Sequence, residues 1–283
     1  MKMTTIEWTK KTWNPLIGCK IVSAGCTNCY AQKMAHRLAG MRNRPEYKGL
    51  TERKPGKPAV WSGVIRRNSP KVFRAPVGDK RGSVYFVNSM SDLFYEEANE
   101  HDVLDIINIM NSLPHHIFQV LTKRPGYAAD FIAKHNVRLG DHVWIGTSVE
   151  NAKVTGRVDD LRRIPARTRF LSIEPLIGSV GPLDLDSIHW VIAGGESGIG
   201  ARPCSIDWVR DIRDQCIRRG APFFFKQWGK VENNPEGVDD GYGKGGAMLD
   251  GILWRQFPST GHPLDMQSDP PHGMVVHEGR IAA

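Results

Sequence analysis

Residues 142–174 read HVWIGTSVENAKVTGRVDDLRRIPARTRFLSIE, a stretch that contains two short apolar runs separated by a more polar segment. The runs are HVWIGTS (142–148) and TRFLSIE (168–174), and the segment over 150–163 is compatible with a helix. Nearly continuous apolar runs of this length are typical of strands that are buried on both faces of a parallel sheet. The stretch therefore predicts a strand–helix–strand unit.

The same alternation extends to both sides of this unit. Helices are expected over 101–113, 126–135 and 205–219, the last with Ser205 as its N-cap and Gly220 as its stop signal. The chain contains about seven such units, which predicts an α/β fold with parallel strands. The remaining predicted strands are TWNPLIG (12–18), SVYFVNS (83–89), HIFQVLT (116–122), IHWVIAGG (188–195) and PFFFKQW (222–228).

Polar residues follow almost every predicted strand, and they favour one of two parallel folds. In a TIM-like βα barrel, full or partial, the ends of many strands build one site, whereas a doubly wound open sheet concentrates its site at one switch point. The many polar strand ends therefore predict the barrel. These residues are Asn88, Ser89, Ser91, Asp92, Thr122, Lys123, Arg124, Thr147, Ser148, Glu150, Asn151, Ser172, Glu174, Gly194, Gly195, Glu196, Ser197, Lys226, Gln227 and Trp228.

The composition is that of an ordinary globular protein of 283 residues with a net charge of +8. No apolar run approaches the roughly 20 residues of a membrane-spanning helix, and the N-terminal MKMTTIEWTKKTWNP lacks the apolar core of a signal peptide. We therefore expect a cytoplasmic protein without membrane contact, whose thiols stay reduced. The barrel is predicted over 1–228, followed by a C-terminal extension over 229–283 that is rich in Gly, Pro and Asp.

The segment 41–81 contains twelve Lys or Arg and three acidic residues, a net charge of +9. Its many Pro and Gly residues predict a loop excursion after the first βα unit rather than a helix. Such a segment is either a solvated surface loop or an arm that contacts the phosphates of a nucleic acid. In the second case Arg66 and Arg67 are candidate substrate ligands, and Trp61 is a candidate for stacking on a base.

Three of the five cysteines, Cys19, Cys26 and Cys29, lie within eleven residues in the pattern C-x6-C-x2-C. In a cytoplasmic protein, clustered cysteines indicate a metal site or redox chemistry rather than disulfides. A structural zinc site needs a fourth ligand, for which His36 is the candidate. An iron–sulfur cluster with three protein ligands would instead leave one iron open for a small molecule. Thiol chemistry and simple packing are the remaining alternatives.

A three-cysteine loop after the first strand of a βα barrel resembles the radical SAM enzymes, whose usual spacing is C-x3-C-x2-C. Along nearly its whole length the chain is also similar to a phage- and prophage-associated three-cysteine-motif family of uncharacterised function that is radical SAM-like. The stretches that carry this similarity are EWTKKTWNPLIGC, GCTNCYA, FVNSMSDLF, LTKRP, WIGTSVEN, FLSIEPLIG, VIAGGESG and FFFKQWG.

The resemblance implies a [4Fe–4S] cluster on Cys19, Cys26 and Cys29, with S-adenosylmethionine (SAM) on the open iron and an external electron donor. Reductive cleavage of SAM would then generate a radical that abstracts hydrogen from the substrate. The basic segment predicts a nucleic acid or nucleotide that is modified or repaired. Two alternatives stay open. One is a nucleic-acid-binding protein with a structural zinc or iron–sulfur site, and the other is a non-radical βα-barrel enzyme with zinc-bound cysteines.

Within this hypothesis the strand ends bind the cofactor and the substrate. The GGES of 194–197 is similar to the GGE motif that contacts the amino group of SAM, although it follows a later strand. The candidates for the amino and carboxylate groups of SAM are Glu174, Glu196, Lys123 and Arg124. The other cofactor candidates are Asn88, Ser89 and Asp92 for the ribose, with Thr147, Ser148, Gly194 and Gly195. The substrate candidates at the last strand are Lys226, Gln227 and Trp228.

Overall fold

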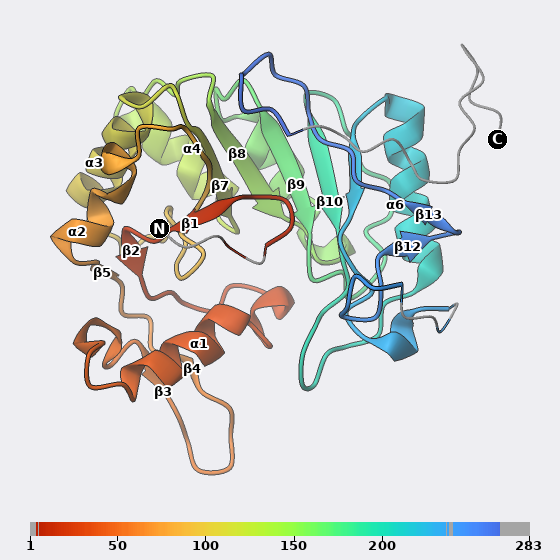
Figure 1. Ribbon diagram of the computed structural model, residues 1–283, viewed down its shortest axis with the longest axis horizontal. Coiled ribbons are helices and arrows are strands. Elements are labelled where there is room, and N and C mark those ends of the chain that lie inside the picture. The colour runs from red at the N-terminus through yellow and green to blue at the C-terminus, as the bar shows by residue number, and fades with distance from the viewer. Residues whose placement is uncertain (1–3, 5, 236, 238–239, 267–283) are drawn as a thin grey trace.

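A seven-stranded parallel sheet forms the body of the molecule in the computed structural model, which describes residues 4, 6–235, 237 and 240–266 (Figure 1). Its strand order is β1-β6-β7-β8-β9-β10-β11, so each strand pairs with the preceding strand of the same sheet. The predicted run over 12–18 overlaps the end of β1, and each of the other six runs contains one strand of the sheet. The strands are β1 (Lys11–Trp13), β6 (Val84–Val87), β7 (Ile117–Thr122), β8 (Val143–Ser148), β9 (Arg169–Ile173), β10 (Trp190–Ala193) and β11 (Phe223–Phe225).

The sheet is a half-barrel, with β1 and β11 at its two edges. Sequential parallel order is the order of a TIM-like barrel, so the predicted βα fold is present in its partial form. The free edge of β11 is covered by a returning segment of the chain. Phe225 N donates to Trp254 O at 2.9 Å, and Gln256 N donates to Phe223 O at 3.1 Å. The exposed backbone groups that an edge strand would offer to another molecule are therefore paired here.

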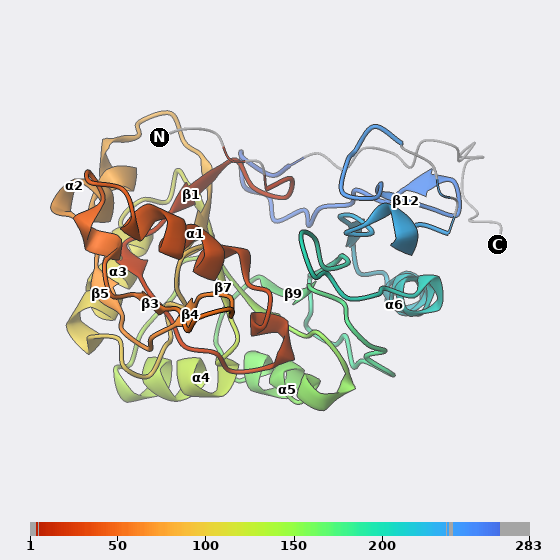
Figure 2. The ribbon, with the colours of Figure 1, turned by 90° about the horizontal axis from the view of Figure 1, so that it is seen from below.

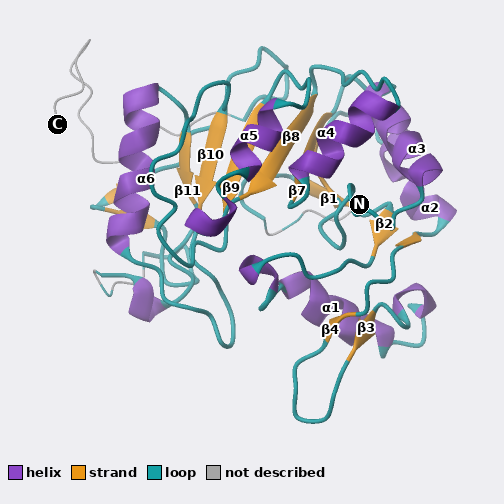
Figure 3. Ribbon diagram, turned by 180° about the vertical axis from the view of Figure 1, so that it is seen from behind, coloured by secondary structure: helices purple, strands orange, loops and turns teal. Residues whose placement is uncertain are grey.

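Helices cover the outer face of the sheet (Figure 3). The predicted ends of the last helix are confirmed: Ser205 Oγ accepts from Asp207 N, and Gly220 takes a left-handed φ of 71°. The helix expected over 150–163 is shorter, because a separate 3₁₀ turn at Ala152–Val154 precedes it. These helices are α3 (Glu100–Asn111), α4 (Pro125–Lys134), α5 (Arg157–Arg162) and α6 (Ile206–Arg219).

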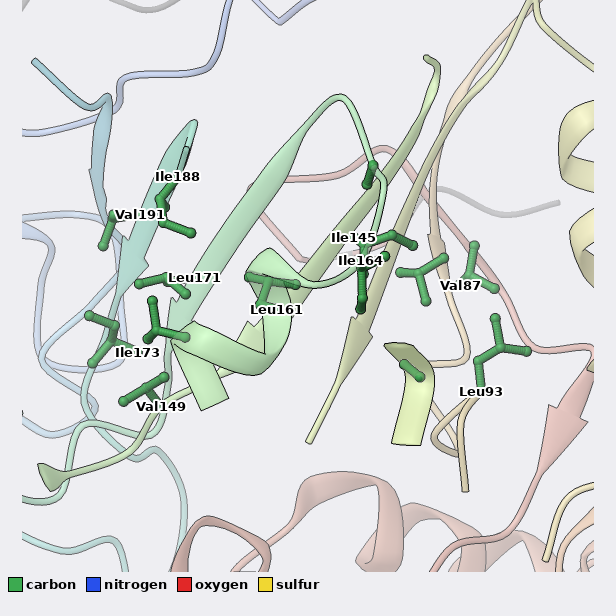
Figure 4. Close-up of a cluster of buried hydrophobic side chains, with 14 of the residues drawn as sticks. Val87, Leu93, Ile145, Val149, Leu161, Ile164, Leu171, Ile173, Ile188 and Val191 are labelled. Carbon is green, nitrogen blue, oxygen red and sulfur yellow. The ribbon is translucent and has the colours of Figure 1, made fainter. Parts of the chain in front are cut away.

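Side chains along each strand alternate between an outer and an inner core. In β6, Tyr85 and Val87 pack in the outer core, whereas Val84 and Phe86 pack in the inner one. Figure 4 shows branched side chains of the outer core between the strands and α5. Burial on both faces explains why the strands are almost continuously apolar in the sequence.

The inner core is mostly aromatic and is completed by the segment that precedes β1. Trp144 and Trp190 come from the strands, and Trp8 packs against Phe86 with ring centroids 4.8 Å apart. Phe257 packs against Trp190 from the other end of the chain, with centroids 5.4 Å apart. The interior is therefore filled by side chains, as in closed barrels.

A small N-terminal lobe, residues 30–61, lies at the carboxyl end of the sheet (Figures 1 and 3). It consists of α1 (Tyr30–Ala39), a 3₁₀ turn at Pro45–Tyr47 and a hairpin of β3 (Thr51–Glu52) and β4 (Val60–Trp61). The lobe and two adjoining residues of the body share a separate core. Its members are Ile17, Ala31, Ala35, Tyr47, Leu50, Trp61 and Met90.

The basic segment 41–81 is thus more ordered than the expected loop. Its first part supplies the hairpin of the lobe. Farther along, β5 (Arg66–Arg67) pairs antiparallel with β2 (Leu16–Ile17), and α2 (Pro70–Phe73) follows. The high Pro and Gly content had masked these elements because each spans only two to four residues.

The predicted C-terminal extension packs on the half-barrel over its described part. It forms a hairpin of β12 (Met248–Leu249) and β13 (Ile252–Leu253). Trp254 joins the outer core, and Leu264 packs against the inner one. The last part of the predicted extension, 267–283, lies outside the described residues. Among the residues that the structure describes, no helix is both long and apolar enough to cross a bilayer.

Candidate functional site

A cavity of about 270 Å³ opens at the carboxyl end of the sheet, and all three loop cysteines line it. Its floor is apolar and consists of Ile6, Trp8, Phe86 and Leu121. The structure brings most of the predicted site residues together at this cavity, although they come from different strands. These residues are Cys19, Cys26, Cys29, Trp61, Asn88, Ser89, Asp92, Lys123, Arg124, Ser148, Glu174, Gly195, Glu196, Lys226 and Gln227.

Five predicted site residues do not line the cavity. Thr147 is fully buried and donates to Thr122 O at 2.8 Å. The indole of Trp228 is also buried and donates to Met248 O at 2.9 Å, while Gly194 N donates to Ile173 O. Arg67 pairs with Asp102 at 2.9 Å, and Arg66 lies beside it in β5. Each of these residues serves local packing or strand pairing instead.

The cysteine loop, residues 18–29, is held from β8 by a buried carboxylate. Glu150 follows β8 and is fully buried; its Oε1 accepts from Gly25 N at 3.0 Å. Its Oε2 accepts from Arg157 at 3.0 Å. Burial raises the pKa of Glu150, but the Ser23 hydroxyl, the Gly25 amide and the Arg157 charge outweigh it and hold the pKa below its usual range. A Cβ on Gly25 would lie 3.1 Å from the Glu150 carboxyl carbon, so the glycine permits this close approach.

A second carboxylate holds the loop from β10. Glu196 Oε2 accepts from Asn28 Nδ2 at 2.9 Å and from Arg202 Nε at 2.8 Å. Arg202 also donates to Ala24 O at 2.9 Å. Burial raises the pKa of Glu196, but the bonds from Arg202 and Asn28 hold it below its usual range. Both carboxylate oxygens of Glu196 are therefore engaged within the protein.

The third anchor of the loop is Arg124, which follows β7. Its guanidinium donates to Asp92 at 3.1 Å, to Glu96 at 2.7 Å and to Lys20 O at 3.3 Å. Asp92 also accepts from Thr122 Oγ1 at 2.7 Å. It does not cap the following helix, where the N-cap is Asn99. The loop is thus fixed beside Cys19, beside Cys26 and beside Cys29 by three different strand ends.

The three thiols differ in their surroundings. Burial, reinforced by the negative charge of Asp92, raises the pKa of Cys19 to about 12. Among the described residues, no group of three His, Cys, Asp or Glu side chains is arranged to hold a single metal ion. His36, the fourth ligand considered for zinc, bonds instead to Thr51 Oγ1 at 3.1 Å.

The far wall of the cavity contains an internal ion pair and polar atoms without a protein partner. Lys226 Nζ bonds to Glu174 Oε1 at 2.7 Å, and Gln227 Nε2 bonds to the same oxygen at 3.1 Å. Asn88 Nδ2, Ser148 Oγ and Gln227 Oε1 are buried and have no hydrogen-bond partner among the described residues. Buried polar atoms of native proteins are nearly always satisfied, so three unsatisfied atoms on residues that line one cavity are unusual.

Lys123 and Lys20 are cations of the cavity whose side chains form no salt bridge with the described residues. Arg124 and Lys226, in contrast, are both paired with carboxylates. Of the two candidates for binding a carboxylate, the geometry thus favours Lys123. For an ammonium, both Glu174 and Glu196 already have cationic partners within the protein.

Several residues of the site were assigned no role from the sequence. Glu150 was noted as a strand end, and its anchoring role depends on Gly25, which is 125 residues away. Asn28, Arg202 and Trp8 carry no local signal for a site. Only the position of Asn28, between Cys26 and Cys29, could have pointed to the site.

Comparison with known proteins identifies a family. A family model described as "Protein of unknown function (DUF5131)" matches residues 3–258, which include the whole half-barrel, the lobe and the cavity. No curated protein and no solved structure matched the chain. Because the model covers most of the sequence, the chain belongs to the DUF5131 family.

Proposed function

We propose that this protein is a radical SAM-like iron–sulfur enzyme that cleaves SAM reductively and acts on a nucleic acid or nucleotide. The observation that carries the proposal is the single cavity lined by three cysteines of one loop and by the polar ends of β6 to β11. A site built from many strand ends at the carboxyl side of a parallel barrel is the usual place for catalysis in such folds.

Three cysteine thiols at one cavity are a donor set that suits an iron–sulfur cluster. Cys19, Cys26 and Cys29 would hold a [4Fe–4S] cluster, whose usual protein ligands are cysteine thiolates. When bound, the cluster and SAM would supply the reductive chemistry that generates a radical. The three anchors of the loop, Glu150, Glu196 and Arg124, fix the cysteines before any group binds. Such preorganisation by surrounding residues is typical of functional metal sites.

The remaining residues of the cavity offer contacts for small molecules. Lys123 can pair with a carboxylate such as that of SAM, since its side chain forms no salt bridge with the described residues. Asn88 and Ser148 present unpartnered polar atoms, and the floor around Trp8 and Phe86 is apolar. A few polar groups above an apolar floor suit a ligand with a flat ring.

The decisive experiment is anaerobic purification followed by metal and turnover analysis. We expect about four irons and four sulfides per chain and release of 5′-deoxyadenosine when SAM and dithionite are added. Cys26→Ala should lose both the iron and the cleavage, whereas Cys216→Ala, a change in the outer core away from the cavity, should keep both. One zinc per chain with no SAM cleavage would overturn the proposal and favour a structural zinc site or a non-radical enzyme.

A further inference from the structure

The N-terminal lobe (30–61) holds most of the molecule's excess positive charge. It contains eight Lys or Arg and two Glu, a net +6 of the chain's +8. One of the eight, Arg44, pairs with Glu46. The other seven are exposed and form no salt bridge with the described residues: Lys33, Arg37, Arg42, Lys48, Arg53, Lys54 and Lys57.

This charged lobe is also a wall of the cavity. Tyr30 and Ala31 of α1 and Trp61 of β4 all line it. The hairpin tip between β3 and β4 projects away from the body, as Figures 1 and 3 both show. Lys57 is four residues from Trp61, so their Cα atoms are at most about 14 Å apart along the chain. A ligand seated in the cavity could therefore extend directly onto the cationic tip.

From this placement we propose that the lobe docks the phosphate backbone of a single-stranded nucleic acid and that one nucleotide of the strand enters the cavity. The inference rests on the proposed function and names its substrate as a strand rather than a free nucleotide. A group of exposed cations that form no salt bridge with the described residues is the charge complement of a repeating polyanion. A free nucleotide would use the cavity and would not need seven cations outside it.

The cavity itself favours a single strand over a duplex. Two residues that line it, Asn88 and Gln227, carry a buried donor (Nδ2) and a buried acceptor (Oε1) without a partner among the described residues. A nucleobase offers both kinds of complementary group on its Watson–Crick edge, but in a duplex that edge is already paired. Enzymes that act on a base inside a pocket accordingly use single strands or extrude the nucleotide. The apolar floor at Trp8 and Phe86 is suited to the face of such a base.

The test is fluorescence anisotropy with the full-length protein and labelled oligonucleotides of about 12 nucleotides, as single-stranded DNA, single-stranded RNA and duplex DNA. The variant Lys54→Glu/Lys57→Glu changes the hairpin tip. The matched control is Arg138→Glu/Arg218→Glu, which reverses two exposed charges at the amino-terminal end of the sheet. Circular dichroism of both variants verifies that they fold.

We expect both single strands to bind more tightly than the duplex. The tip variant should lose about tenfold or more in affinity at physiological salt, and its slope of log K against log salt should fall by about 1.4, since each single-strand phosphate contact contributes about 0.7. The control variant should lose less than threefold. The binding assay needs neither iron nor SAM, so its result is independent of SAM cleavage and the two proposals can fail separately.

Three outcomes would overturn the inference. The first is equal loss of affinity in the tip and control variants, which would indicate nonspecific attraction. The second is a preference for duplex DNA. The third is unchanged nucleic-acid binding by the tip variant together with slower reduction by an acidic electron-carrier protein, which would assign the lobe to that partner. If only the single-stranded DNA or only the RNA binds, the inference stands and the source of the strand is identified.

Discussion

The carboxylate of Glu150 accepts a hydrogen bond from the backbone amide of Gly25 at 3.0 Å, although the two residues are 125 positions apart in the chain. This bond ties the cysteine loop to the end of β8 from within the protein. The opposite carboxylate oxygen pairs with Arg157, which follows on α5. The geometry of the cysteines therefore depends on an ion pair that itself contains no cysteine.

Replacing Glu150 tests this dependence. Glu150→Gln keeps an acceptor near Gly25 but leaves Arg157, whose side chain is 10% exposed, without its counter-charge. Removing one partner of a buried pair costs about 3–5 kcal/mol, so we expect the free energy of unfolding in urea to fall by about 3 kcal/mol. The iron content after anaerobic purification should fall as well.

The matched control is Asp159→Asn, since the carboxylate of Asp159 is 80% exposed where it pairs with Arg162. Exposed pairs contribute about 0–1 kcal/mol, so the control should change stability by less than about 1 kcal/mol. Similar losses in the two variants would show that Glu150 has no special role.

Acid should destabilise the protein through its paired carboxylates. Hydrogen bonds hold the pKa values of Glu150 and Glu196 below their usual range despite burial. At Asp79 as well, bonds from Lys11, Tyr85 and Ser83 outweigh burial and lower the pKa. Because the folded form binds fewer protons than the unfolded form, stability is fully present above the unfolded pKa values and is lost as pH falls through the lower folded ones.

We therefore expect a melting temperature that is nearly constant from about pH 5 to 7 and falls steadily below about pH 4.5. Asp79→Asn should flatten this acid slope. Asp141→Asn, which changes a carboxylate that is 70% exposed, should leave it unaltered. A slope that is the same in both variants would contradict the contribution of Asp79.

Four of the five cysteines should separate into two classes in an alkylation experiment. Burial raises the pKa values of Cys204 and Cys216 to about 12, so both thiols stay protonated and covered at pH 8. Cys26 and Cys29 are partly exposed at the cavity. In the metal-free protein, iodoacetamide should label Cys26 and Cys29 under native conditions and label Cys204 and Cys216 after unfolding in urea, as read by peptide mass spectrometry. Rapid native labelling of Cys216 would contradict the packing of α6.

Gly195 is a position where any side chain should be costly. A Cβ there would collide with the carbonyl oxygen of Trp228, a backbone atom that cannot rotate away. We expect Gly195→Ala to lower the free energy of unfolding by about 2 kcal/mol, within the range found for overpacking. Gly156→Ala is the control, because nothing lies within 4 Å of its Cβ position and its φ is −55°. That change should be neutral or stabilising by up to about 1 kcal/mol, and equal destabilisation in both variants would exclude the steric cause.

Local features that the sequence encodes over a few residues could be predicted well. The strand runs were readable because both faces of each strand are buried, so the alternation of a half-exposed strand is absent. The ends of α6 were readable because Ser205 and Gly220 satisfy backbone groups within their own turns. The two- to four-residue elements of 41–81 could not be read, because their pairing with β2 and α1 comes from contacts outside the segment.

The sequence by itself determined the parallel βα order, the three-cysteine spacing and the polar strand ends, because each is a property of neighbouring residues. The tertiary structure alone decided that the sheet stays a half-barrel, that Trp8 forms part of the cavity floor and that the lobe carries its charge beside the cavity. It also decided that Glu196 holds Asn28 of the cysteine loop, 168 residues away. Such contacts depend on how distant segments pack, and no local pattern of residues specifies which carboxylate finds which partner.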